Sequence, residues 1–239
     1  MVFMLKSHRF VLALVLGLIA APTAWAGNDD TDWANLHAFR QRDADLVAHG
    51  PVPHRVVFMG DSITEFWDQD HQNQFAEPTH INRGISGQTT QQMLLRFRQD
   101  VIALQPETVI ILAGTNDIAG NTGTTTNAMI EDNIASMAEL ARPHGIRVIL
   151  ASVLPADHYW WAPDIKPVAR IADLNQWLKA FAVKQGAGYI NFFTPMADQA
   201  GGLRPEYGAD GVHPNAAGYA VMNRLVKEAL STPSSVSER

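Results

Sequence analysis

The sequence predicts an α/β fold in which a parallel sheet carries helices on both faces. Short runs rich in Val and Ile recur along the chain. Three of them show little alternation between apolar and polar residues, which is typical of strands buried on both faces. Longer segments with apolar residues at helical spacing lie between these runs. Strands that alternate with helices indicate a parallel sheet with right-handed crossovers.

Five apolar runs are candidate strands, at residues 56–59, 80–82, 108–113, 147–152 and 189–193. The carboxyl ends of parallel strands share one edge of a sheet, and binding crevices form beyond that edge. Functional residues are therefore expected directly after these runs.

The intervening segments predict amphipathic helices, because their apolar residues recur three or four positions apart. The predicted helix that contains Met129 and Leu140 should end near Pro143 and Gly145. The apolar stripes are Met93, Leu94, Phe97, Val101 and Leu104; Met129, Ile130, Ile134, Met137 and Leu140; Ile171, Leu174, Trp177, Leu178 and Phe181; and Ala216, Tyr219, Val221, Met222 and Leu225.

Length and composition indicate one globular domain with a substantial core, since the 239 residues are 46% hydrophobic and 18% charged. A net charge of −6 argues against a nucleic-acid partner. The chain has no cysteine, which excludes a thiol nucleophile, a thiolate metal site and disulfides. No metal-ligand spacing and no phosphate-binding glycine loop is present, so no metal or cofactor is expected.

The first 26 residues resemble a secretory signal peptide. Lys6 and Arg9 precede an apolar run at 10–21, and AWA at 24–26 has the small-x-small pattern of a cleavage site. We expect cleavage after Ala26 and export to the periplasm or the medium. An uncleaved membrane anchor is the alternative, and no other segment could span a membrane. Residues 27–239 are then predicted to form a single domain.

Four polar clusters follow the predicted strands: GDS at 60–62, NRG at 82–84, GTND at 114–117 and DGVHP at 210–214. A serine hydroxyl is a weak nucleophile, so it needs a base within hydrogen-bond reach and a third group that orients the base. We therefore expect Ser62 as nucleophile, His213 as base and Asp210 as orienting acid. Only three positions separate the last two, so one loop could supply both.

The tetrahedral intermediate of acyl transfer carries an oxyanion that needs hydrogen-bond donors. The predicted donors are the backbone N–H groups of Ser62 and Gly84 and the side-chain amide of Asn116. Asp61 is expected to support the loop rather than take part in chemistry. A rival pair, Asp157-His158, is interpreted as part of a pocket wall.

Four aromatic residues on loops are predicted to bind substrate, either an apolar acyl chain or the face of a sugar, although simple loop packing is an alternative. They are Trp67, Tyr159, Trp160 and Trp161. Three further polar residues could support the site: Arg83, Thr115 and Asp117.

These four clusters, in this order, resemble the GDSL or SGNH family of serine esterases and lipases over residues 55–225. Ser62, Gly84, Asn116 and His213 correspond to the four residues after which SGNH is named, and Asp210 to the triad acid; the fourth letter of GDSL is isoleucine here. The stretches NRGISGQTTQQML and ILAGTNDIAGNT are similar to the acylhydrolase branch that contains the catalytic subunits of platelet-activating-factor acetylhydrolase.

That resemblance implies a flavodoxin-like three-layer α/β/α sandwich with a five-stranded parallel sheet. It also implies removal of small acyl groups, often acetyl, from a small-molecule or glycan ester. We therefore expect an exported serine esterase for short acyl groups. A lysophospholipase or thioesterase for longer chains is the enzymatic alternative. A noncatalytic binding module and a flavodoxin-like redox protein are the alternatives from other classes.

Overall fold

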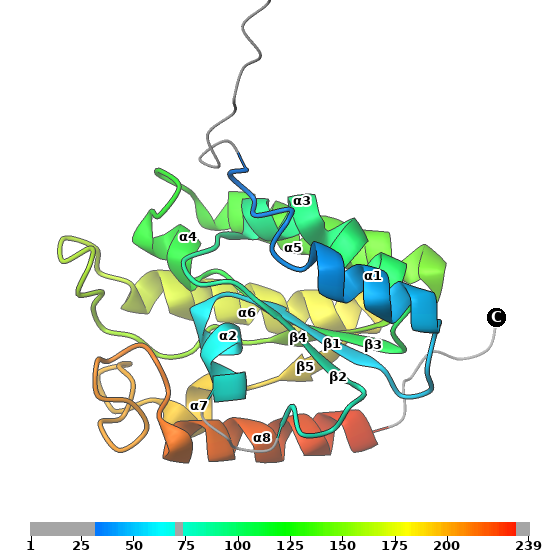
Figure 1. Ribbon diagram of the computed structural model, residues 1–239. Helices are drawn as coiled ribbons and strands as arrows, with labels where there is room; N and C mark the ends of the chain where they lie inside the picture. Colours follow the sequence, from blue (N-terminus) through cyan, green and yellow to red (C-terminus); the bar gives the residue numbers. More distant parts are fainter. Residues whose placement is uncertain (1–31, 70–73, 233–239) are drawn as a thin grey trace, which may run out of the picture. The chain divides into compact units, whose positions relative to one another are not determined.

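The computed structural model describes residues 32–69 and 74–232 (Figure 1). The predicted signal peptide and its cleavage site therefore lie outside the described residues. No helix within the described ranges has the length and apolar character needed to cross a membrane.

Five parallel strands form one sheet in the order β2-β1-β3-β4-β5. In the register, Gly60 at the end of β1 pairs with Gly84 of β2 and with Leu112 of β3, so these three strands end level with one another. The strands are β1 (Val56–Gly60), β2 (His80–Gly84), β3 (Thr108–Leu112), β4 (Arg147–Ala151) and β5 (Gly188–Ile190).

All five predicted strands are confirmed, and only the last differs appreciably in its bounds. Residues 189–193 were expected to be extended, but β5 ends at Ile190 and a short helix begins at Phe193. The cause is Ser152 at the end of β4. Its Oγ accepts the N–H groups of both Phe192 and Phe193 at 2.9 Å, which turns the chain out of the sheet.

Four helices confirm the predicted amphipathic segments, although the first ends at Asp100 and its last apolar residue, Leu104, lies in a 3₁₀ turn (Ile102–Leu104). Helices α1, α2, α4 and α7 are additional. The second predicted helix ends at Ala141, and a 3₁₀ turn (Arg142–His144) leads to Gly145 in the left-handed conformation. The helices are α1 (Arg40–His49), α2 (Ser62–Gln69), α3 (Thr90–Asp100), α4 (Thr115–Ala119), α5 (Asn127–Ala141), α6 (Val168–Gln185), α7 (Phe193–Met196) and α8 (Ala216–Ser231).

The sheet separates two helical layers, which confirms the predicted three-layer sandwich (Figure 1). Successive strand residues point to opposite faces. Val57 and Met59 belong to the core beneath α3, α5 and α6, whereas Phe58 packs with Trp67 of α2 and Tyr219 of α8. Both faces of β1 are therefore buried, as its unbroken apolar sequence predicted.

Arg96 of α3 is fully buried and ties the ends of β1 and β2 together. Its Nη2 donates to the carbonyls of Gly60 (3.1 Å) and Arg83 (2.8 Å), its Nε donates to Gln88 Oε1 (2.6 Å), and its Nη1 pairs with Asp100 (2.9 Å). These bonds hold the loop after β2 against the carboxyl end of β1, where the functional residues gather.

Candidate active site

Ser62 is the first residue of α2 and follows β1 across a sharp turn. Gly60 permits that turn, because a Cβ at this position would lie 2.1 Å from Thr64 Oγ1. Asp61 closes the turn: its Oδ1 accepts the N–H of Ile63 at 3.0 Å and its carbonyl accepts the N–H of Glu65 at 2.9 Å. The chain therefore passes from strand to helix within two residues, which places Ser62 at the carboxyl end of β1.

The structure brings Ser62, His213 and Asp210 into one hydrogen-bonded chain. Ser62 Oγ lies 2.9 Å from His213 Nε2, and His213 Nδ1 lies 2.7 Å from Asp210 Oδ2. The other oxygen of Asp210 accepts the backbone N–H groups of Val212 and His213 at 2.9 and 2.8 Å. Two loops 151 residues apart in sequence therefore meet here, as the sequence predicted.

The two acids near His213 have opposite electrostatic environments. Burial raises the pKa of Asp61 to about 7, and the hydrogen bond from Ile63 and the nearby His213 offset this only in part. Burial also acts to raise the pKa of Asp210, but hydrogen bonds from the side chain and backbone of His213 and from Val212 outweigh it and lower that pKa. Asp210 is therefore the better partner for a positively charged imidazole.

The backbone N–H of Gly84, predicted to be an oxyanion donor, already has a hydrogen-bond partner, so that prediction was wrong. Its backbone N–H donates to Asn82 Oδ1 at 2.8 Å. A Cβ on Gly84 would lie 2.2 Å from the backbone nitrogen of Glu65. Gly84 is thus required for close packing of β2 against α2, and its N–H is not available to an oxyanion.

Gly87, three residues further on, is the glycine that sequence reasoning missed. Its N–H has no hydrogen-bond partner among the residues that the structure describes, and its φ of 77° is in the left-handed region. The backbone N–H of Ser62 is likewise unpaired within the described ranges. The only signal in the sequence was a second glycine in NRGISG, and nothing in the sequence favoured it over the first.

Asn116 lies in the first turn of α4 and is buried beside the Gly87 loop. Its Nδ2 donates to the carbonyl of Gln88 at 3.0 Å, and its Oδ1 accepts from Asn121 Nδ2 at 3.0 Å. One Nδ2 hydrogen bond is used in this way, and an amide nitrogen carries two hydrogens. Asn116 can therefore still donate one hydrogen bond to a substrate.

The four predicted substrate-binding aromatics divide into two groups. Trp67 is 2% exposed, stacks on Tyr219 with 5.7 Å between ring centroids, and donates its indole N–H to Asn223. Tyr159 is also fully buried, and burial raises its pKa to about 12 while its hydroxyl bonds Thr115 at 2.9 Å. These two side chains belong to the core, so their assignment to substrate binding was wrong.

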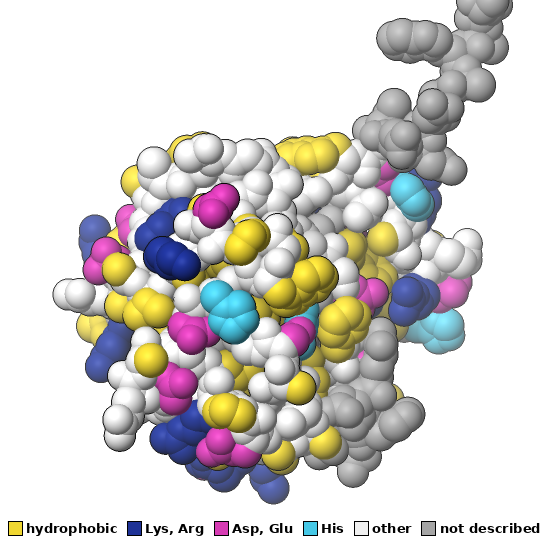
Figure 2. All heavy atoms as spheres, turned by 90° about the vertical axis from the view of Figure 1, so that its left-hand side faces the viewer, with side chains coloured by type: hydrophobic (Ala, Val, Ile, Leu, Met, Phe, Trp, Pro, Cys, Tyr) yellow, Lys and Arg dark blue, Asp and Glu magenta, His cyan; other side chains and the backbone are white. Residues whose placement is uncertain are grey.

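Trp160 and Trp161 remain at the surface of the loop that follows β4. Trp160 is 64% exposed, and its ring meets that of Trp161 edge-on at 5.3 Å. Trp161 is partly buried and donates its indole N–H to Asn121 Oδ1 at 2.9 Å. The loops after β4 and before α8 protrude on the left of Figure 1, and Figure 2 faces that side. Histidine, acidic and apolar side chains mix near the centre of this face, with Lys and Arg toward its periphery.

The rival pair Asp157-His158 is hydrogen-bonded, with 2.6 Å between the carboxylate and the ring. The His158 ring lies close to the loop that carries Asp210 and His213. A Cβ on Gly211 in this loop would lie 2.9 Å from His158 Cε1. Both side chains are about half exposed. The pair therefore lies next to the loop that carries His213, and its place in a pocket wall stays a prediction.

The three polar residues expected to support the site make different contacts. Thr115 bonds Tyr159, and Asp117 accepts both the N–H and the hydroxyl of Thr90 at the start of α3. Arg83 instead forms a buried ion pair with Asp43 of α1. Arg83 therefore attaches α1 to the edge of the sheet.

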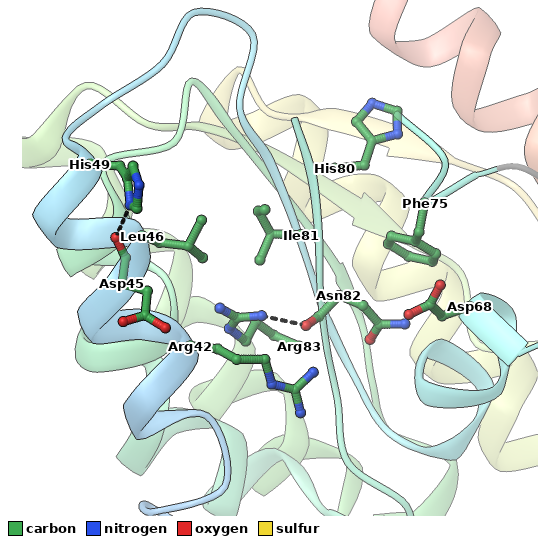
Figure 3. Close-up of a pocket in the computed structure, with 10 residues that line it drawn as sticks. All are labelled: Arg42, Asp45, Leu46, His49, Asp68, Phe75, His80, Ile81, Asn82 and Arg83. Atoms are coloured by element: carbon green, nitrogen blue, oxygen red, sulfur yellow. Dashed lines mark hydrogen bonds between the residues drawn. The ribbon is translucent and has the colours of Figure 1, made fainter. Parts of the chain in front are cut away.

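A separate cavity of about 380 Å³ lies between α1 and the edge strand β2 (Figure 3). None of the predicted catalytic, oxyanion-hole or substrate-binding residues lines it, but Arg83, which was expected to support the site, does. Its lining residues are Arg42, Asp45, Leu46, His49, Asp68, Phe75, His80, Ile81, Asn82 and Arg83.

Residues 58–221 match the GDSL-like lipase/acylhydrolase family. A GDSL-like lipase of Bacteroides thetaiotaomicron is 45% identical to this chain, and its crystal structure superimposes on 82% of this chain and 97% of its own with a TM-score of 0.80. A Streptococcus pneumonia protein described as a platelet activating factor is 28% identical over 82% of this chain and 92% of its own, with a TM-score of 0.68.

Esterase TesA of Pseudomonas aeruginosa is 31% identical over 135 residues, which are 56% of this chain and 60% of the esterase. A second curated relative is matched over 32% of its length, so the chain spans less than two thirds of the curated relatives it matches. The family match covers more than half of the chain and includes all four motif clusters. This chain therefore belongs to the GDSL-like lipase/acylhydrolase family of carboxylic ester hydrolases.

Proposed function

We propose that the chain is a serine esterase in which Ser62 is the nucleophile, His213 the general base and Asp210 the acid that orients the ring. The observation that carries this proposal is the unbroken hydrogen-bonded chain from Ser62 Oγ through both ring nitrogens of His213 to Asp210 Oδ2. An ionised Asp210 accepts a hydrogen bond from the N–H at His213 Nδ1, which leaves the unprotonated Nε2 free to accept the Ser62 proton.

In the acylation step, Ser62 Oγ attacks the ester carbonyl and His213 Nε2 takes its proton. The imidazolium is stabilised by Asp210 and then protonates the departing alcohol. Water, deprotonated by the same nitrogen, hydrolyses the acyl-enzyme and releases the acid. General-base assistance of this kind contributes about 10²–10⁴ in rate.

We assign the oxyanion to three donors: the backbone N–H groups of Ser62 and Gly87 and the remaining Nδ2 hydrogen of Asn116. Support comes from the two unpaired backbone N–H groups and from the short link between Asn116 and the Gly87 loop, 3.0 Å from Asn116 Nδ2 to the carbonyl of Gln88. Each such donor contributes about 10²–10³ in kcat when it is aimed at the developing charge.

The proposed substrate is an ester with a short acyl group, such as acetyl on a carbohydrate or on a simple alcohol. With Trp67 and Tyr159 in the core, Trp160 and Trp161 are the predicted aromatics that remain to contact substrate. An exposed indole beside the site suits the flat face of a sugar or aryl leaving group. We also propose export after cleavage near Ala26, which N-terminal sequencing of the secreted or periplasmic protein would test.

The decisive measurement is kcat/KM over p-nitrophenyl esters from two to sixteen carbons, with acetate release from acetylated glycans measured in parallel. We expect the highest values at two to four carbons and a loss of at least about 10⁴-fold in Ser62→Ala. An optimum at ten or more carbons would replace the short-acyl proposal by a lysophospholipase or thioesterase. Absence of both Ser62-dependent hydrolysis and fluorophosphonate labelling would indicate a binding module.

A further inference from the structure

We propose that Asn121 is a positioning residue for the oxyanion donors, and that Trp161 holds Asn121 in the required orientation. Asn121 follows α4, and all its side-chain hydrogen-bonding groups are used: Nδ2 donates to Asn116 Oδ1 (3.0 Å) and to the Gly87 carbonyl (3.1 Å), and Oδ1 accepts from Trp161 Nε1 (2.9 Å). This inference rests on the serine esterase function proposed above.

Asn116 needs such a partner because the two ends of a carboxamide have similar shapes and opposite hydrogen-bonding character. A half-turn of the Asn116 amide would present an oxygen instead of an N–H to the oxyanion. In that orientation Oδ1 would face the carbonyl of Gln88 and Nδ2 would face the NH₂ group of Asn121. Both contacts are repulsive, so Gln88 and Asn121 together select the productive orientation.

Asn121 also positions a second proposed donor, the backbone N–H of Gly87, by bonding the carbonyl of the same residue. Gly87 has φ of 77°, and a glycine can rotate more freely than any other residue. The bond from Asn121 Nδ2 to the Gly87 carbonyl restrains this loop. A single side chain is therefore bonded to the residues that supply two of the three proposed donors.

Trp161 decides which way the amide of Asn121 faces. An indole N–H can only donate, so the atom of Asn121 beside it must be the oxygen and the NH₂ group must face Asn116. The Trp161 ring is itself packed between Tyr159 and Trp160, with centroid separations of 5.0 and 5.3 Å. The loop after β4 thereby sets the orientation of Asn116 through one intermediate side chain.

The test compares Asn121→Asp with Asn121→Ala, using p-nitrophenyl acetate and the wild-type and Ser62→Ala proteins as references. An aspartate cannot donate to Asn116 Oδ1 and instead attracts its NH₂ group, which favours the unproductive orientation. We expect Asn121→Asp to lower kcat by about 10²-fold, the cost of one misdirected donor, with KM nearly unchanged. Alanine removes only one of the two selecting contacts, so its loss should be smaller.

Two further measurements separate positioning from a general structural effect. Affinity for an alkyl boronic acid, whose adduct with Ser62 is tetrahedral and anionic, should fall by the same factor as kcat/KM. Trp161→Phe, which lacks the indole N–H, should lower kcat by less than Asn121→Asp. The control Asn191→Asp makes the same charge change at another exposed asparagine, whose Oδ1 bond to the N–H of Thr194 an aspartate retains, and should leave kcat unchanged.

The inference is overturned if both Asn121 variants have wild-type kcat and boronate affinity while wild-type hydrolysis depends on Ser62. It is also overturned if they raise KM and leave kcat unchanged, because Asn121 would then act in substrate binding. If the wild-type protein shows no Ser62-dependent hydrolysis, the proposed function fails and this inference fails with it.

Discussion

The carboxylate of Asp210 binds His213 twice: Oδ2 lies 2.7 Å from the ring Nδ1, and Oδ1 lies 2.8 Å from the backbone nitrogen. The same Oδ1 also accepts the N–H of Val212. One acid therefore shapes the loop and orients the ring, and its two oxygens have separate tasks.

The separate roles of the two Asp210 oxygens predict the outcome of Asp210→Asn. The asparagine oxygen is expected to keep the two backbone N–H bonds, which leaves its NH₂ group facing His213 Nδ1. The ring must then carry its proton on Nε2, where it cannot accept the Ser62 proton. We expect kcat to fall by about 10⁴-fold with little change in the urea midpoint of unfolding. A loss below tenfold would show that Asp210 does not orient the base.

Asp61 predicts a pH dependence of stability. Its pKa is about 7 in the folded chain against an ordinary 3.8, so between these values the folded state holds a proton that the unfolded state has released. Stability contributed by this group is therefore lost as the pH rises, by up to about 4 kcal/mol above pH 7. Asp61→Asn keeps the acceptor for Ile63 and cannot ionise.

Urea unfolding of wild type and Asp61→Asn at pH 4 and pH 8 measures this effect. The variant should gain stability relative to wild type as the pH increases. A difference in unfolding free energy that stays constant between the two pH values would contradict a raised pKa for Asp61.

The buried Arg96 and the exposed Arg98 of α3 allow a matched comparison of stability. Arg96→Met leaves Asp100 buried without its ion-pair partner and removes the bonds to Gly60, Arg83 and Gln88, so we expect a loss of about 3–5 kcal/mol. Arg98→Met makes the same change at an exposed position of the same helix and should cost no more than about 0.5 kcal/mol. Equal costs for the two would mean that the buried network contributes nothing specific.

The two classes of tryptophan should respond differently to truncation. Trp67→Ala removes a buried ring that packs on Phe58 and Tyr219, and should destabilise the fold by about 3–5 kcal/mol. Trp160→Ala should change stability by no more than about 0.5 kcal/mol, because its ring is 64% exposed, and should raise KM for esters with aryl or sugar leaving groups. Unfolding midpoints and KM values for both variants decide this, and a destabilised Trp160→Ala would refute it.

Gly211 lies between Asp210 and His213, in a backbone conformation that strains any residue with a side chain. Its φ is 78°, and a Cβ would approach His158 Cε1 to 2.9 Å. Gly211→Ala should therefore displace the loop and lower kcat by at least about tenfold. Adding His158→Ala removes the collision but leaves the strained backbone, so it should restore only part of the activity. Full activity in the single variant would show that the loop is less tightly held.

Much of the site was predictable because its residues follow strands. The run at 56–59 is apolar throughout and the run at 108–113 is apolar after Thr108, so their ends were evident, and the polar residues after them had to lie at one edge of the sheet. The sequence could not predict which of these groups serves packing and which remains free to bind substrate. Gly84 and Gly87 are the same residue type three positions apart, and only the proximity of Glu65 to the first shows that it serves packing.

The sequence by itself determined the family, the five strands and the positions of Ser62, Asn116 and His213 after strands, because these depend on local pattern and on spacing. The tertiary structure alone decided which groups are free to act. Trp67 is buried because α8 packs over it, and the orientation of Asn116 depends on side chains from two other segments. Burial and hydrogen-bond pairing are properties of neighbours in space, and residues far apart along the chain supply those neighbours.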